Sequence, residues 1–343
     1  MSKKKKRRSS GAKKKPAAQP PLPLWKLLVQ QLLLTGLLLC VFALFHHVLP
    51  RYARRAPEPP AAAEAVQPTS APLPILQPEA AAAEDTGEAP DPGPFTAEVV
   101  VTDSSYSGPS LAFTLKSFDH PAEHPSLSYY VADVHIKSVE QLRAALPSEG
   151  RLFGDPLSIA KEAKAILAVN GDNAIGSVFS LRNGVLKKNA PNVPGDICVL
   201  CRDGRMEIFE AKSYDPKAIL AEEPWQIWCF GPALLDSEGQ PLTEFNIDHS
   251  LQVRHPRTAI GYYAPGHYCL LVIDGRNKDH SRGATLEETA QILAELGCRS
   301  AYNLDGGASS VMVWKDKIVN LPSHDRAVTD MIVLQELGEE AAP

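Results

Sequence analysis

Two apolar runs in the last third of the chain each stop at an Asp-Gly pair, and a helical pattern lies between them. The first run, residues 268–273, precedes Asp274, and the second, residues 301–304, precedes Asp305. Residues 285–296 carry an apolar stripe at helical spacing, start with a Thr-x-x-Glu capping box and are followed by glycine. Strand, helix and strand in this order predict a βαβ unit with parallel strands, so we expect both aspartates at the same edge of one sheet.

The residues that follow Asp305 suit a ligand site. Gly306 and Gly307 have no Cβ, so their backbone can adopt unusual conformations and approach a ligand closely. Ser309 adds a hydroxyl two residues further on. Asp-Gly-Gly is also good turn chemistry, and a tight turn between two strands is the alternative interpretation of these residues.

A third apolar run, residues 166–169, also ends in polar residues, at Asn170-Gly171-Asp172. Further strand and hairpin patterns occupy residues 96–101, 111–118, 129–136, 182–184, 197–201, 202–205 and 206–209. A short helix is predicted around residues 142–145. This mixture predicts an α+β or mixed α/β fold, in which residues 95–343 form a single globular domain with a mixed sheet and the βαβ segment.

Several of these stretches together resemble the phosphodiester glycosidases. That family includes the catalytic domain of N-acetylglucosamine-1-phosphodiester α-N-acetylglucosaminidase and bacterial exopolysaccharide-biosynthesis-related homologues. The matching motifs, in the family's order, are Asn170-Gly171-Asp172, Arg182-Asn183-Gly184, Phe-Gly-Pro-Ala-Leu-Leu at 230–235, Arg-Thr-Ala-Ile-Gly at 257–261, Asp274-Gly275-Arg276, Asn-Leu-Asp-Gly-Gly at 303–307 and Asp325-Arg326. Two departures are Ala308 in place of a third glycine, and Asn173 and Ala174 in place of the aromatic residues common after Asn-Gly-Asp.

The resemblance implies a hydrolase that cleaves a sugar-1-phosphodiester, with the Asn-Leu-Asp-Gly-Gly stretch at its catalytic pocket. A carboxylate near C1 can stabilise an oxocarbenium-like transition state, attack it or activate water. Asp305 is therefore the first catalytic candidate and Asp274 the second. Arginines suit the departing phosphate because they form charge-assisted hydrogen bonds with it. The candidates for substrate binding are Asn170, Asp172, Arg257, Arg276, Asn303, Gly306, Gly307 and Ser309.

Each candidate also has a structural alternative, for example Arg276 in a surface ion pair, Asp274 as a turn former and Asn303 as a strand-end cap. A second functional hypothesis is a non-catalytic domain that binds sugar phosphates during assembly of an envelope polysaccharide. It would use the same polar edge without turnover.

The cysteines and histidines predict no cofactor. Cys198 and Cys201 have the spacing of a redox or zinc pair, but residues three apart in a strand point to opposite faces. We therefore expect buried thiols there, with zinc or redox chemistry as the weaker alternative. His120 and His124 are spaced as His-x-x-x-His, but they lie in a predicted loop. A divalent cation held by the strand-end aspartates remains an alternative to a metal-free site.

The N-terminal region predicts a membrane anchor. Residues 1–26 hold ten Lys or Arg and no acid, and an apolar segment follows. Its length is close to the roughly 20 residues that cross a bilayer. We predict a basic cytoplasmic tail (1–26), an uncleaved signal anchor in the lipid bilayer (27–49), a disordered Pro/Ala-rich linker (50–94) and an extracellular domain on a single-pass protein of the cell membrane.

The charge of the domain excludes one class of partner. All 40 acidic residues lie after the apolar segment, and subtracting the charged residues of the tail, anchor and linker leaves residues 95–343 with a net charge of 22 − 33 = −11. A nucleic-acid-binding domain needs basic patches, so no nucleic acid is expected as a partner. A small sugar phosphate or an envelope glycan needs only one or two local arginines.

The anchor makes a topological prediction. Protease added to intact cells should release the domain and leave a short membrane stub, because the ten basic residues of the tail keep the N-terminus in the cytoplasm. Immunoblotting of the domain before and after lysis measures this. A domain that stays protected until lysis would show the opposite orientation.

Overall fold

The computed structural model describes residues 93–148, 150–173, 175–190, 193, 195–210 and 214–337. The predicted tail, the anchor and the linker up to residue 92 lie outside the described residues. No helix in the described ranges has both the length and the apolar character needed to cross a membrane.

The largest element is a seven-stranded sheet in which every neighbouring pair is antiparallel. Its strands, in spatial order, are β1 (Val100–Val101), β2 (Ser105–Ser107), β3 (Leu111–Asp119), β4 (Ser128–Ile136), β13 (His267–Ile273), β12 (Arg257–Ala264) and β14 (Ser300–Asn303). Helix α6 (Leu286–Glu295) connects β13 to β14, and the predicted capping box of Thr285 and Glu288 is present at its start.

Two five-stranded sheets complete the domain, and they too are antiparallel throughout. One consists of β10 (Met206–Phe209), β9 (Ile197–Cys201), β11 (Pro224–Trp228), β7 (Phe179–Arg182) and β8 (Val185–Asn189). The other consists of β16 (Lys317–Ile318), β15 (Met312–Trp314), β6 (Leu167–Asn170), β17 (Met331–Leu334) and β5 (Leu142–Ala145). The short helices are η2 (Val139–Gln141), α3 (Pro156–Glu162), α4 (Pro216–Ala221), α5 (His249–Gln252) and η3 (Gly307–Ser309).

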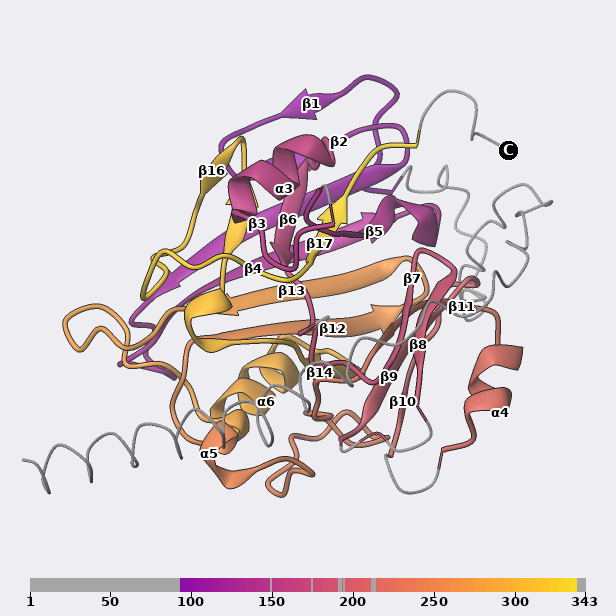
Figure 1. Ribbon diagram of the computed structural model, residues 1–343. Helices are drawn as coiled ribbons and strands as arrows, with labels where there is room; N and C mark the ends of the chain where they lie inside the picture. The colour runs from indigo at the N-terminus through magenta and orange to yellow at the C-terminus, as the bar shows by residue number, and fades with distance from the viewer. Residues whose placement is uncertain are drawn as a thin grey trace, which may run out of the picture. The chain divides into compact units, whose positions relative to one another are not determined.

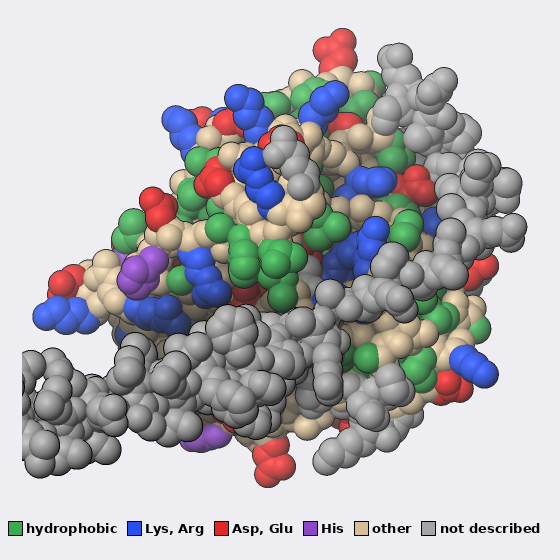
Figure 2. Space-filling model, in the orientation of Figure 1, with side chains coloured by type: hydrophobic (Ala, Val, Ile, Leu, Met, Phe, Trp, Pro, Cys, Tyr) green, Lys and Arg blue, Asp and Glu red, His purple; other side chains and the backbone are tan. Residues whose placement is uncertain are grey.

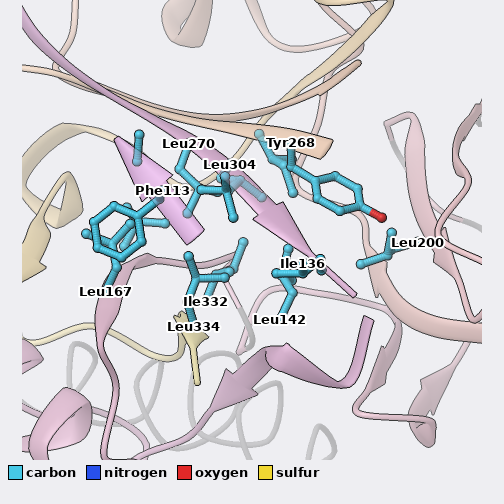
Figure 3. Close-up of a cluster of buried hydrophobic side chains, with 14 of the residues drawn as sticks. Phe113, Ile136, Leu142, Leu167, Leu200, Tyr268, Leu270, Leu304, Ile332 and Leu334 are labelled. Carbon is cyan, nitrogen blue, oxygen red and sulfur yellow. The ribbon is translucent and has the colours of Figure 1, made fainter. Parts of the chain in front are cut away.

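Alternating side chains place the seven-stranded sheet between two cores. In β13, Tyr268, Leu270 and Val272 pack with residues of both five-stranded sheets, whereas Cys269 and Leu271 pack on the side of α6. The ribbon shows α6 beneath β12–β14 and α3 over the opposite side (Figure 1). Figure 3 shows the first core, where leucine, isoleucine and aromatic side chains from three sheets meet.

The structure confirms part of the predicted architecture and corrects part of it. The predicted single sheet-containing domain and its strand–helix–strand segment are present, but the expected mixed sheet is wrong, because all strand pairings among the described residues are antiparallel. The fold is consequently rich in sheet, with few helices, and is not a clear α+β or mixed α/β arrangement. Residues 142–145 form strand β5 and not a helix, because they pair with β17.

The expectation for the cysteines is confirmed. Cys198 packs in the core between the sheets, and Cys201 packs on the opposite face of the same strand. Both thiols are free and buried.

On the face drawn in Figure 2, Lys and Arg side chains are interspersed with Asp and Glu.

The contact between β12 and α6 leads to a stability prediction. A Cβ added at Gly261 would lie 2.5 Å from Sγ of Cys298 and 3.2 Å from Cδ2 of Leu293, closer than packed atoms allow. Gly261→Ala should therefore lower the free energy of unfolding by about 1–3 kcal/mol, measured by urea denaturation. Gly195→Ala is the matched control, since its Cβ would meet nothing nearer than 3.7 Å. Equal stability of the two variants would contradict this packing.

Candidate functional site

The three strand ends predicted to carry polar residues meet in the structure. β13 and β14 both lie antiparallel to β12, so they run in the same direction and finish at the same edge of the seven-stranded sheet, as expected. β6 belongs to another sheet, but its end lies beside the end of β14. Nδ2 of Asn170, the last residue of β6, donates a hydrogen bond of 2.7 Å to the main-chain oxygen of Asp305.

Asn170 holds these elements together. Its Oδ1 accepts hydrogen bonds from the hydroxyl of Thr258 at 2.6 Å and from the main-chain N–H of Val311 at 3.1 Å. Its Nδ2 donates to the main-chain oxygen of Asp305 and, at 3.4 Å, to that of Gly171. Since both amide atoms of this buried side chain bind the chain itself, Asn170 positions Asp305 in this arrangement.

Asp305 is half-buried at this edge. Its Oδ1 accepts a hydrogen bond of 2.9 Å from the N–H of Gly306, and the side chain of Ser309 donates to the same carboxylate. Burial raises the pKa of Asp305 above its ordinary value. The hydrogen bonds from Ser309 and Gly306 oppose this rise, and the charge of Arg326 opposes it as well. Asp305 is thus a desolvated carboxylate next to a cationic side chain.

Other parts of the chain approach both glycines closely, whereas the predicted approach of a ligand remains a prediction. A Cβ at Gly306 would lie 2.9 Å from the main-chain oxygen of Pro256, and one at Gly307 would lie 2.9 Å from Nη2 of Arg276. Gly307 also has φ +67°, which other residues rarely adopt. The absence of side chains at these positions lets the guanidinium of Arg276 lie directly on the turn that follows Asp305.

Arg276 lies on this turn and the charge of Arg326 reaches Asp305, so both arginines are candidates for binding an anion. Arg276 and Arg326 are both exposed. Nη2 of Arg276 lies 3.3 Å from Nδ1 of His255, and within the described part of the chain neither guanidinium forms an ion pair with a carboxylate. Arg326, which lies in the matching Asp-Arg motif, is close enough for its charge to lower the pKa of Asp305.

A buried network of charges lies behind Asp305. Nε of Arg182 donates to Oδ2 of Asp330 at 3.1 Å, and its Nη2 donates to Oδ2 of Asp172 at 3.3 Å. Nη1 of Arg182 also donates to the main-chain oxygen of Ile227. All three charged side chains are almost fully buried. The network joins β6 and β17 of one five-stranded sheet to β7 and β11 of the other.

Gly171 connects this network to Asp305. Its N–H donates to the main-chain oxygen of Asp330 at 3.0 Å, and its own oxygen accepts from the N–H of Asp305 at 3.2 Å. Burial, together with the charges of Asp172 and Asp305, raises the pKa of Asp330 to about 7, although the charge and hydrogen bond of Arg182 oppose this rise. One guanidinium does not neutralise two buried carboxylates, so Asp330 takes up a proton near neutral pH.

Asp172 and Asp274 are bound by the chain through both carboxylate oxygens. Asp274, which is buried, accepts hydrogen bonds from Nδ2 of Asn320, from the N–H of Leu321 and from Nε2 of His280. Besides Arg182, the donors to Asp172 are the N–H of Asn173, the hydroxyl of Ser177 and the N–H of Cys229. These bonds hold the loops around the site, and the predicted catalytic role of Asp274 and substrate contact of Asp172 remain predictions.

Arg257 borders the glycine turn through its backbone, since its Cα would lie 3.8 Å from a Cβ placed at Gly306. Its guanidinium is buried and donates to the main-chain oxygens of Ala284, Gln252 and Val253. Burial lowers its pKa to about 10. Its predicted contact with phosphate remains a prediction, whereas its observed contacts fix α5 and the start of β12.

Asn303 combines satisfied donors with a free acceptor. Its Nδ2 donates to the main-chain oxygens of Gly231 and Leu304. Its buried Oδ1 has no hydrogen-bond partner among the described residues. An unpaired buried acceptor is costly, so this oxygen is a candidate contact for a ligand or an ordered water.

Three residues of the site were not among the candidates predicted from the sequence: Asp330, Arg182 and Arg326. Arg182 and Arg326 lie within the matching motifs but were assigned no role, and Asp330 carries no local motif at all. Only the pairing of β6 with β17 brings Asp330 next to the end of β6, opposite Gly171.

One cavity lined by described residues does not include Asp305. It has a volume of about 940 Å³ and is lined by Asp196, Leu235, Phe245, Asn246, Tyr262 and Arg299, among others. The candidate site at Asp305 is therefore identified by its chemistry and not by this cavity.

Comparison with known proteins gives one family. The sequence model described as phosphodiester glycosidase matches residues 163–335, half of the chain. The chain is also 27% identical over 261 residues to the SPbeta prophage-derived uncharacterized protein YomE of Bacillus subtilis (strain 168). That match covers 68% of this chain but only 39% of the relative, so the chain spans well under half of that protein's length.

Two solved structures share the fold. The zebrafish N-acetylglucosamine-1-phosphodiester alpha-N-acetylglucosaminidase catalytic domain, auto-inhibited by its pro-peptide, superposes with a TM-score of 0.55 at 21% identity, over 67% of this chain and 84% of that one. A hypothetical protein from Synechocystis gives 0.50 at 14% identity, over 65% and 62% of the two chains.

The buried network leads to a prediction about pH. Because the pKa of Asp330 is raised to about 7 in the folded chain, its proton stabilises the fold fully at acidic pH, and this stabilisation is lost as the pH rises through about 7. Asp330→Asn keeps the shape and cannot titrate. The melting temperature of this variant relative to the parent should therefore rise between about pH 5 and about pH 8.

The matched control is Asp316→Asn, which changes an exposed carboxylate at a positive φ that asparagine tolerates. Its melting temperature should follow that of the parent at every pH. Parallel pH profiles for Asp330→Asn and the parent would contradict the raised pKa of Asp330.

Proposed function

Because the chain belongs to the phosphodiester glycosidase family, which gives it a hydrolase-like role, we propose that its domain hydrolyses the bond between a sugar and phosphate in glycosyl-1-phosphodiesters. One observation supports this most directly. A desolvated carboxylate, Asp305, lies beside a glycine turn that carries Arg276, and the charge of the exposed Arg326 acts on the same carboxylate. Within the described part of the chain neither guanidinium forms a direct ion pair with a carboxylate.

The arginines suit the phosphate part of the substrate. A phosphodiester carries one negative charge, and a guanidinium binds its oxygens through paired, charge-assisted hydrogen bonds. Arg276 lies over Gly307, so an anion bound by it also meets backbone that no Cβ shields. Binding strengthens as negative charge accumulates on the departing phosphate, and this differential binding lowers the barrier.

Asp305 suits the sugar part. A phosphate leaves from C1 readily, so the reaction depends little on a general acid and chiefly on a group that deals with the developing positive charge or with water. Burial raises the pKa of Asp305, which strengthens it as a base. In the proposed reaction water adds to C1, the C1–O bond breaks, the phosphate monoester departs and Asp305 accepts the proton of the water.

The proposed setting is the cell envelope. The basic tail and apolar segment of residues 1–49 favour a membrane-anchored protein with its domain outside, where the substrate is an envelope or extracellular glycan. The alternative is a sugar-phosphate-binding domain that acts in envelope polysaccharide assembly without turnover. It is favoured by the several site residues whose polar groups bind the chain itself, as in Asn170 and Asp274.

The decisive variant is Asp305→Asn, which keeps the size of the side chain and removes its charge. Its turnover of a glycosyl phosphodiester should fall by about 10²–10⁴-fold or more, because the amide of asparagine cannot accept a proton from water as the carboxylate does. The kcat and KM are measured by release of the phosphate monoester. Melting temperature and substrate binding should stay close to those of the parent.

Asp279→Asn is the matched control, since it changes an exposed aspartate in the loop that follows Arg276. It should retain parental turnover. Near-parental turnover by Asp305→Asn would remove Asp305 from the mechanism, and a parent that binds such substrates without turnover would favour the binding domain.

A further inference from the structure

Two histidines and an aspartate come together at the end of the seven-stranded sheet that is remote from Asp305. His135 of β4 and His267 of β13 are directly opposite each other in the antiparallel register. Asp133 lies two residues before His135 and so projects from the same face. Because His267 starts β13 and Asp274 follows its end, roughly 20 Å of strand separates this cluster from the turn at Asp305.

The ligand atoms of the three side chains lie close together. Nε2 of His267 lies 2.6 Å from Oδ1 of Asp133, and Nε2 of His135 lies 3.6 Å from the same oxygen. One ligand atom from each residue can be chosen so that all three lie within 4.8 Å of one another. Ligands at about 2.0–2.2 Å from a zinc ion have separations compatible with this spacing after small side-chain movements.

The backbone under the cluster is rigid. β4 and β13 are inner strands, and each has a hydrogen-bonded neighbour on both sides. The side chains of Asp133, His135 and His267 retain 38%, 32% and 30% of their exposure, which leaves room on one side for water ligands. Ligands that project from paired strands need little reordering, so binding costs less conformational entropy.

A metal ion would replace the proton in the hydrogen bond between His267 and Asp133, because a neutral imidazole nitrogen and an ionised carboxylate are the forms that bind metal.

We propose that Asp133, His135 and His267 bind one divalent transition-metal ion of the zinc type, with water completing its coordination. Imidazole nitrogens select such ions over magnesium or calcium, which prefer oxygen ligands. The ion crosslinks β4 and β13 and acts on stability, because it lies far from the turn at Asp305. This site goes beyond the proposed hydrolysis and does not depend on it.

One side chain must turn for the ion to bind. The rings of His135 and His267 are stacked 3.9 Å apart at 19°, so no ion can lie in both ring planes at once. Tyr263 stacks on His267 at 4.2 Å and keeps that ring in place. His135 is at the other side of the stack and is partly exposed, so rotation of its ring brings its Nε2 toward the other two ligand atoms.

The three ligands form no local sequence motif because they come from two distant parts of the chain. Asp133 and His135 are an Asp-x-His pair on one strand, and His267 follows 132 residues after His135. Only the register between β4 and β13 brings them together.

The test uses the purified full-length protein after chelation and dialysis. Zn²⁺ is titrated by calorimetry, and Co²⁺ is titrated in parallel because its visible absorption reports nitrogen coordination. The variants are His135→Gln, His267→Gln and Asp133→Asn, which keep polar side chains of similar size. His324→Gln is the matched control, since this histidine is exposed and lies in a different loop.

The parent and His324→Gln should bind one ion and melt at a higher temperature with Zn²⁺ present. Each of the three cluster variants should lose affinity at least about tenfold. Melting without metal shows that each variant is folded, so that a loss of affinity is a loss of a ligand. An absence of saturable binding by the parent, or equal affinity in parent and cluster variants, would overturn the proposal and show only a hydrogen-bonded His–Asp cluster.

Discussion

The arrangement of the site depends on buried polar contacts that join three separate sheets. Arg182 binds Asp172 and Asp330 across the two five-stranded sheets, and Asn170 binds Thr258 and the main chain of Asp305 in the seven-stranded sheet. A buried charge is stable only when it is paired and hydrogen-bonded, so these contacts accept few alternative geometries. The apolar cores hold the sheets together, while the polar contacts determine where the strand ends meet.

The same contacts prepare the electrostatics around Asp305. Behind it lies a network with more carboxylates than cations, in which burial and then the neighbouring carboxylates raise the pKa of Asp330. In front of it lies the exposed Arg276, and the charge of the exposed Arg326 lowers the pKa of Asp305. The carboxylate thus lies between an interior with an excess of carboxylates and a surface with arginines. A substrate with a neutral sugar and an anionic phosphate matches that polarity.

The sequence predicted the features that depend on local pattern. Alternating residues identified β4 and the two faces of Cys198 and Cys201, and a capping box with an apolar stripe identified α6. Features that depend on distant pairing could not be predicted. The residues of β5 have a helix-like pattern, and only their pairing with β17 makes them a strand. β12 lies between β13 and β14 and is antiparallel to both, so the expected parallel pairing does not occur.

The same limit applies to the site. Asp305 and its glycines stand in one short motif, but Asp330 acquires its place only through the register of β17 with β6. Arginine motifs likewise do not reveal whether a guanidinium is exposed, as in Arg276, or buried and bound to main-chain oxygens, as in Arg257.

The most direct test of the account follows the oxygen atom of water. The purified protein is incubated with a panel of glycosyl-1-phosphodiesters in ¹⁸O-water, and both products are analysed by mass spectrometry. A carboxylate that acts at C1 while arginines receive the phosphate predicts label on the anomeric hydroxyl of the sugar and an unlabelled phosphate monoester. Label in the phosphate would mean attack at phosphorus and would contradict the account, as would the absence of turnover with every member of the panel.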